Sequence, residues 1–151
     1  MEKYSFSAAE TFAVWRNNYE RCWLCHRPLS LLECTVDHVL PERLIENDEE
    51  RATVFRLFGL DSTFELNSFV NWLPAHSWCN AKKSDLVLDY SGGVQIVLQK
   101  LREHAHRTAA MAANLQSQTT KGRVLGPLGA ALSSGSLNEF DLRSFLSRYG
   151  Y

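Results

Sequence analysis

Two short pairs of metal-binding residues constrain this chain more than any other feature of its sequence. Cys22 and Cys25 are separated by two residues, and His76 and Cys79 repeat that spacing much later in the chain. A two-residue spacer places two ligands on one side of an ion, and two such pairs complete the tetrahedral shell of sulfur and nitrogen that Zn²⁺ takes in structural sites. The spacing therefore predicts one structural zinc held by Cys22, Cys25, His76 and Cys79.

Cys34 lies outside both pairs and is the rival fourth ligand. An all-cysteine site in which Cys34 replaces His76 stays open, but Cys34 has no partner at the two-residue spacing, so we favour it as a small buried hydrophobe. Sparse, unevenly spread cysteines fit metal binding in a reducing compartment better than a disulfide framework. We expect no signal peptide, because the first residues lack its apolar stretch, and no segment approaches ~18 consecutive apolar residues. We expect a cytoplasmic protein with no membrane partner.

The size and composition of the chain limit the architectures that it can adopt. A chain of 151 residues fits one domain, so we expect residues 1–151 to fold as a single unit. Its 45% hydrophobic and 22% charged residues exclude collagen-like, disordered and coiled-coil classes. The net charge of -1 gives no sign of a nucleic-acid partner. However, residues 41–79 carry three basic and seven acidic side chains, whereas residues 80–151 carry nine and five. A small basic face for a phosphate is therefore expected in the C-terminal half.

The first two thirds of the chain mix helix and strand signals. Ser7 and Glu10 have the spacing of a capping box, which predicts a helix over 8–20. Helical spacing of apolar residues before a glycine predicts a second helix over 47–58. Runs with strand character occur at 34–40 and 71–75, and a helix is expected to start at about 77.

The last third of the chain is expected to be helical. Apolar residues at helical intervals after Gly93 predict a long helix. A segment rich in Ser, Thr and Gly predicts a loop over 117–135. Ser136 and Glu139 have capping-box spacing and predict a closing helix, whose apolar residues, expected to be buried, are Phe140, Phe145, Leu146 and Tyr149. Together these elements predict an α+β protein.

Three blocks of residues follow one another along the chain, and they are Cys22-x2-Cys25, Asp37-His38-x2-Pro41 and Asn71-x4-His76-x2-Cys79-Asn80-x2-Lys83. Taken in order, these blocks resemble the zinc-bearing branch of the HNH endonuclease family. His76 stands where many members have cysteine, and Asn80 stands where many have histidine. The resemblance implies a small ββα-metal finger with a structural zinc, surrounded by α-helices. It assigns the HNH core to about 22–90 and a helical C-terminal extension to about 91–151.

The resemblance also implies a chemistry, which is metal-dependent hydrolysis of phosphodiester bonds in a nucleic acid, with DNA as the expected substrate. His38 would be the general base that takes a proton from the attacking water. Asp37 and Asn80 would hold one catalytic cation, Mg²⁺ or Mn²⁺, through oxygen. Asn71 would orient His38 or brace its loop, and Lys83 would meet a phosphate of the nucleic acid.

Two other roles stay open at this point. A catalytically inactive, zinc-stapled module that binds nucleic acid or protein is the alternative, although binding alone does not require Asp37, His38, Asn71 and Asn80 together. The C-terminal helices could also dock a protein partner or form a homo-oligomer. The stretch between His38 and Asn71 is longer than in compact family members, and it could gate the site or contact a partner.

Overall fold

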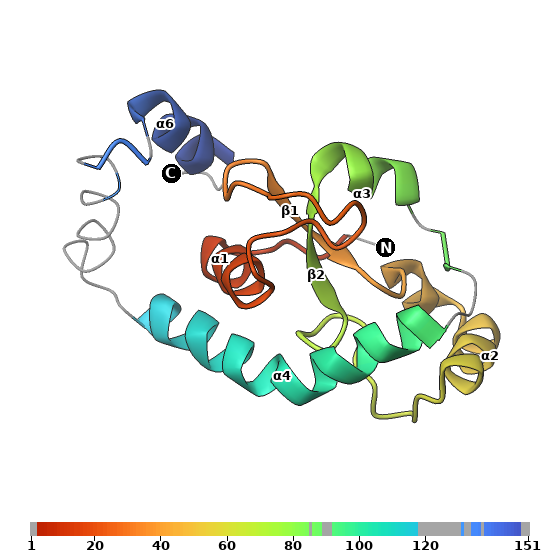
Figure 1. Ribbon diagram of the computed structural model, residues 1–151. Coiled ribbons are helices and arrows are strands. Elements are labelled where there is room, and N and C mark those ends of the chain that lie inside the picture. The colour runs from red at the N-terminus through yellow and green to blue at the C-terminus, as the bar shows by residue number, and fades with distance from the viewer. Residues whose placement is uncertain are drawn as a thin grey trace.

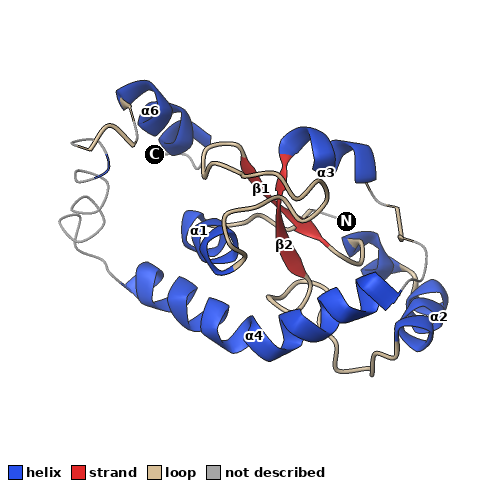
Figure 2. Cartoon of the chain, viewed as in Figure 1, coloured by secondary structure: helices blue, strands red, loops and turns tan. Residues whose placement is uncertain are grey.

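The structure is a computed structural model of the chain, and it describes residues 3–84, 86–88, 92–117, 131, 134–136 and 138–148. The chain forms a two-stranded sheet. Figures 1 and 2 show this sheet at the centre with helices around it. In chain order the elements are α1 (Ala8–Asn17), β1 (Cys34–His38), the 3-10 helix η1 (Glu42–Glu46), α2 (Asp48–Phe58), β2 (Trp72–His76), α3 (Ser77–Lys83), α4 (Gly92–Ser117) and α6 (Glu139–Arg148). The fold is α+β, as predicted.

The two strands bring together segments that are far apart in the sequence. β1 and β2 pair antiparallel, with Cys34 opposite His76 and His38 opposite Trp72. α3 begins at the residue that follows β2, so the His76–Cys79 pair spans the junction of a strand and a helix. The loop that carries Cys22 and Cys25 lies along β2, because the backbone N–H of Trp23 donates to the carbonyl of Pro74 at 3.0 Å. The sheet thus places both ligand pairs at one end.

Local signals account for where the first helices begin and end. Ser7 and Glu10 form the predicted capping box, which satisfies backbone N–H groups at the start of α1. α1 ends at Asn17, before the predicted boundary, because Tyr19 and Glu20 adopt left-handed backbone angles with φ of 60° and 55°. The other predicted N-terminal helix is α2, which is terminated by Gly59 at φ 66°.

The main hydrophobic core anchors the end of β1. Val39 and Leu40, which directly follow the strand, are buried against α2 and α4 residues that include Phe58 and Leu98. Figure 1 shows α4 running along one side of the molecule, with α1 between α4 and the strands. Although α4 has 26 residues, neither it nor any other helix in the described ranges combines the length and apolar composition needed to cross a bilayer. Its apolar stripe is used inside the protein.

Two predictions for the C-terminal segment are wrong. α6 begins at Glu139, and Asn138 caps it by accepting a hydrogen bond from the backbone N–H of Asp141 at 2.8 Å, so Ser136 and Glu139 do not form the predicted capping box. Phe140 is 80% exposed rather than buried. The side chain of Phe145, all of Tyr149 and most of the predicted loop over 117–135 lie outside the described residues.

Candidate functional site

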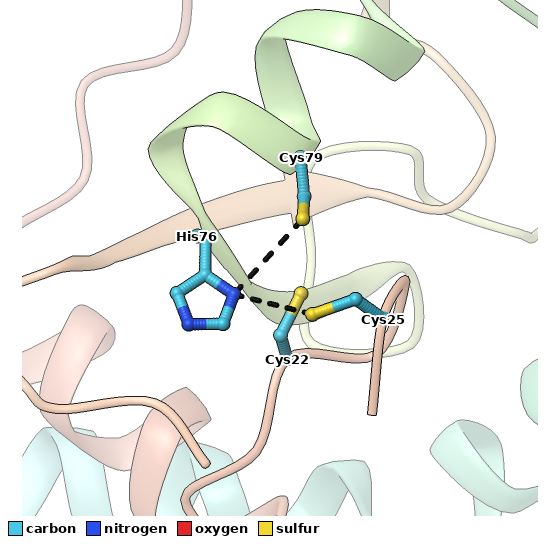
Figure 3. Close-up of side chains that lie close together, drawn as sticks. All are labelled: Cys22, Cys25, His76 and Cys79. Atoms are coloured by element: carbon cyan, nitrogen blue, oxygen red, sulfur yellow. Dashed lines mark hydrogen bonds between the residues drawn. The ribbon is translucent and has the colours of Figure 1, made fainter. Parts of the chain in front are cut away.

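Cys22, Cys25, His76 and Cys79 converge into one cluster, as their spacing predicts. Their ligand atoms all lie within 4.8 Å of one another. Figure 3 shows the side chains pointing toward a common centre from the loop after α1 and from the junction of β2 and α3. Nδ1 of His76 lies 3.4 Å from Sγ of Cys25 and 4.0 Å from Sγ of Cys79. These distances bracket the edge of about 3.6 Å that a zinc tetrahedron with ordinary bond lengths requires.

The loop that carries the first ligand pair is a tight turn closed by backbone hydrogen bonds. The N–H of His26 donates to the carbonyl of Cys22 at 2.8 Å, and the N–H of Cys22 donates to the carbonyl of Arg27 at 3.0 Å. His26 takes a left-handed conformation at φ 59°, which turns the chain sharply after Cys25. Arg21 and Pro28 then form an isolated antiparallel bridge. The turn holds both sulfur atoms on one side.

The second ligand pair lies where a strand meets a helix, with His76 buried at the end of β2. The indole of Trp78 stacks on the His76 ring with 4.0 Å between centroids and covers one face of it. A backbone hydrogen bond from Arg27 lowers the pKa of the Cys25 thiol, whereas burial and the neighbouring thiols raise the pKa of Cys79 to about 11. Binding of Zn²⁺ would convert these thiols to thiolates. The donor set fits structural zinc.

Cys34 does not belong to the cluster of ligand atoms. It is 1% exposed, packs with Leu29 and Ala75 beside the cluster, and its Sγ contacts the carbonyl of Thr35 at 3.7 Å. Burial raises the pKa of the Cys34 thiol to about 12, so this sulfur stays protonated. Cys34 is therefore packed as a small hydrophobic residue, as we favoured, and His76 completes the ligand group.

A cavity of about 380 Å³ lies beside β1 and α3. Its walls include Asp37 and His38 at the end of β1, Asn80 and Lys83 on α3, and the N-terminal segment around Tyr4. Four of the five residues to which the resemblance assigns a chemical role therefore line a single hollow. Asp37 and His38 leave the strand on opposite faces but both reach its wall, because they occupy the end of β1.

His38 is held at the cavity wall by a neighbouring amide. Its Nε2 lies 2.7 Å from Oδ1 of Asn67, and its ring packs near Phe6 and Trp72. Burial lowers the pKa of His38, although the hydrogen bond with Asn67 acts in the opposite direction. The imidazole is therefore neutral near neutral pH, which is the form that can accept a proton.

Asp37 is 4% exposed and both of its oxygens have partners inside the protein. Oδ2 accepts a hydrogen bond from Nε1 of Trp23 at 2.9 Å, and Oδ1 accepts one from Nζ of Lys83 at 3.1 Å. Burial raises the pKa of Asp37, while Lys83 and Trp23 oppose that shift. A cation at Asp37 would have to share this carboxylate with Lys83.

The side chain of Lys83 is turned into the protein, whereas we expected it to contact a phosphate of the nucleic acid. The side chain is 3% exposed, and Nζ donates to the Asp37 carboxylate and, at 2.6 Å, to the carbonyl of His38. An ammonium group that is buried in an ion pair is not presented to solvent as a contact for phosphate. The prediction that Lys83 meets the nucleic acid is therefore not supported, because the carboxylate of Asp37 draws the side chain inward.

The two asparagines of the resemblance lie in different environments. Asn71 is fully buried, and its side chain bonds only backbone: it accepts from the N–H of Leu40 at 2.8 Å and donates to the carbonyls of Leu40 and Leu66 at 2.8 and 2.9 Å. It braces the turn after His38, which was one of the two expected roles. Asn80 is half-buried and its Nδ2 donates to Thr35 and Val36 at 3.3 and 3.4 Å, which leaves its oxygen as the end that can bind an ion.

The structure adds three residues that the sequence did not indicate. Asn67 contacts His38, Glu42 contacts Asn67, and Trp23 links the Cys22–Cys25 turn to Asp37. Asn67 is 29 positions from His38 and stands in no spacing motif, so no local signal could have identified it. The sequence showed that Trp23 lies between Cys22 and Cys25, but it did not show that Asp37 is its hydrogen-bond partner.

Comparison of the chain with known protein families, with curated proteins and with solved structures finds no match in any of the three.

Proposed function

We propose that this protein is a metal-dependent endonuclease of the HNH type, built on a ββα-metal finger with a structural zinc. The single observation that carries the proposal is that Asp37, His38 and Asn80 line one cavity of about 380 Å³ on the β1 and α3 side of the Cys3His group. A general base, a carboxylate and an amide oxygen are the side chains that hydrolysis of a phosphodiester with one hard cation uses. The expected substrate is DNA.

In the proposed reaction His38 acts on the attacking water. The imidazole takes one proton from the water, whose oxygen forms a bond to phosphorus while the bond from phosphorus to the 3' oxygen breaks. Burial lowers the pKa of His38, which keeps the ring in its basic form near neutral pH. The hydrogen bond with Asn67 limits rotation of the ring, and Asn71 holds the turn that follows it.

Asp37 and Asn80 would hold the catalytic cation, for which Mg²⁺ and Mn²⁺ are the candidates because both donors are oxygens. When bound, such an ion would neutralise charge that develops on the phosphate oxygens. Lys83 competes for the charge of Asp37, so we expect the cation to bind weakly unless nucleic acid is present. Cys22, Cys25, His76 and Cys79 would hold zinc for structure only, and their thiols fit the cytoplasmic location expected from the sequence.

Cleavage of a plasmid tests the proposal. Supercoiled DNA is incubated with the zinc-loaded protein and Mg²⁺ or Mn²⁺, and the wild type is compared with His38→Ala and with His104→Ala, which changes an exposed histidine on α4. We expect the wild type and His104→Ala to relax or linearise the plasmid and His38→Ala, once shown to be folded, to lose at least 100-fold in rate. Equal cleavage by all three, or none by any with either metal, would sink the nuclease proposal.

The ion pair between Lys83 and Asp37 favours a second candidate, the inactive binding module. Lys83 neutralises the charge of Asp37 without any metal ion, and a protein that binds nucleic acid but does not cut it would tolerate this. A shift of a DNA fragment on a native gel, together with intact DNA after long incubation with either metal, would support this candidate. The predicted core at 22–90, the extension at 91–151 and a protein or homo-oligomer partner at the C-terminal helices stay predictions.

A further inference from the structure

A chain of three hydrogen-bonded groups runs from the N-terminal segment to His38. The carboxylate of Glu42 accepts hydrogen bonds from the backbone N–H of Tyr4 at 2.9 Å to Oε1 and 3.2 Å to Oε2. Oε1 of Glu42 also accepts one from Nδ2 of Asn67 at 2.8 Å. Oδ1 of Asn67 then lies 2.7 Å from Nε2 of His38. Glu42, Asn67 and His38 therefore form one relay, anchored by a backbone donor.

The chemistry of the first group determines the orientation of the others. An ionised carboxylate only accepts hydrogen bonds, so Glu42 must face the NH₂ group of Asn67. The carbonyl oxygen of Asn67 is then the end that faces His38, and a carbonyl oxygen also only accepts. Nε2 of His38 must therefore carry a proton. In a neutral imidazole the lone pair is then on Nδ1.

We propose that Glu42 and Asn67 are positioning residues that hold His38 in the tautomer with its proton on Nε2, so that Nδ1 is the atom that accepts the proton from water. This inference rests on the proposed function for the base role of His38, but the tautomer itself is a property of the protein without substrate. Neither Glu42 nor Asn67 needs to touch the nucleic acid. Glu42 and Tyr4 belong to the cavity wall, and Asn67 acts from behind the ring.

Glu42→Leu is the variant that separates this role from a simple brace. Oε1 of Glu42 accepts from both the backbone N–H of Tyr4 and Nδ2 of Asn67, so the amide oxygen in Glu42→Gln can take that position and keep both hydrogen bonds. In Glu42→Leu no acceptor faces the NH₂ group of Asn67, so the amide can rotate and present that group to His38. Nε2 of His38 then acts as an acceptor, with the ring proton on Nδ1. Glu42→Gln is therefore the conservative variant that should retain the relay.

Nitrogen NMR of the histidine rings reads the tautomer directly. Spectra of the zinc-loaded protein without DNA are recorded at about pH 8.5, two units above the usual histidine pKa, and His38 is assigned by its loss in His38→Ala. We expect Nε2–H in the wild type and in Glu42→Gln, and an increased population of the Nδ1–H tautomer in Glu42→Leu. Glu65→Gln is the matched control, because it removes one negative charge from an exposed side chain two residues from Asn67 and should leave the tautomer unchanged.

Cleavage rates complete the test. We expect Glu42→Leu to lower kcat by about 10-fold with little change in KM, since the base is then presented in part through the wrong nitrogen, and we expect Glu42→Gln to retain kcat. An Nδ1–H tautomer in the wild type, an unchanged tautomer in Glu42→Leu, or an increased Nδ1–H population with full kcat each overturns the inference. If Glu42→Leu shifts the tautomer but the wild type cuts no nucleic acid, the relay stands as the holder of the tautomer, and the proposed function and the base role of Nδ1 fail.

Discussion

Asn71 and Asn80 both belong to the motif that resembles HNH enzymes, yet the structure predicts opposite consequences for their removal. Asn71→Ala leaves the buried N–H of Leu40 without its partner, which costs about 1–3 kcal/mol. Two hydrogen bonds to the carbonyls of Leu40 and Leu66 are also lost, at about 1 kcal/mol each. The expected loss of folding free energy is therefore about 3–5 kcal/mol, a large part of the ~5–15 kcal/mol of a typical domain.

Asn80→Ala is the matched control for this prediction. Its hydrogen bonds of 3.3 and 3.4 Å are long, and its side chain is half-buried, so water can replace them and the expected loss is about 1 kcal/mol or less. Urea unfolding of both zinc-loaded variants, followed by circular dichroism, gives the comparison. A drop in midpoint of about 1.5–3 M for Asn71→Ala is expected. If Asn71→Ala were as stable as Asn80→Ala, the assignment of Asn71 as the brace of the turn after β1 would be refuted.

Two further predictions concern a buried charge and a partly buried phenol. Lys83→Met should destabilise the fold by about 3–5 kcal/mol, because it leaves the Asp37 carboxylate buried without its cation. Adding Asp37→Asn should recover at least half of that loss in urea unfolding. A Lys83→Met variant within ~1 kcal/mol of the wild type would contradict this prediction. Burial, with the Glu10 hydrogen bond, raises the pKa of Tyr4 to about 12. The contribution of the neutral Tyr4 phenol to stability should thus be complete below about pH 10 and be lost as the pH rises toward 12. The phenolate absorbance of the wild type minus that of Tyr4→Phe should have its midpoint near pH 12 rather than near pH 10.

The parts of the site that could be predicted are those that follow from local spacing. A pair of ligands two residues apart is a property of one turn, so the Cys22–Cys25 turn and the His76–Cys79 junction were visible before any fold was known. Strand character around Asp37 and a helix start after His76 are local as well. Because two such pairs typically share one ion, their meeting was also predictable.

The parts that could not be predicted depend on which distant groups the fold brings together. Lys83 looked like a surface cation, but the partner that buries it, Asp37, is 46 positions away. For Asn71 the sequence left two roles open, orienting His38 or bracing its loop, because the three backbone groups that it serves are determined by the path of the chain after β1. At the C-terminus, Asn138 caps the helix and Ser136 does not. Both residue types cap well, so the sequence could not show at which of them the helix begins.

The proposed zinc centre is the central claim, because the four ligand residues join the Cys22 turn to the junction of β2 and α3. Elemental analysis of the purified protein should find about one zinc per chain. Cys79→Ser should lose the zinc and the folded signal in circular dichroism together, whereas Cys34→Ala, which changes a buried cysteine beside the cluster, should keep the zinc. A wild-type protein that is folded without zinc, or a Cys34→Ala variant that loses it while Cys79→Ser retains it, would contradict the account.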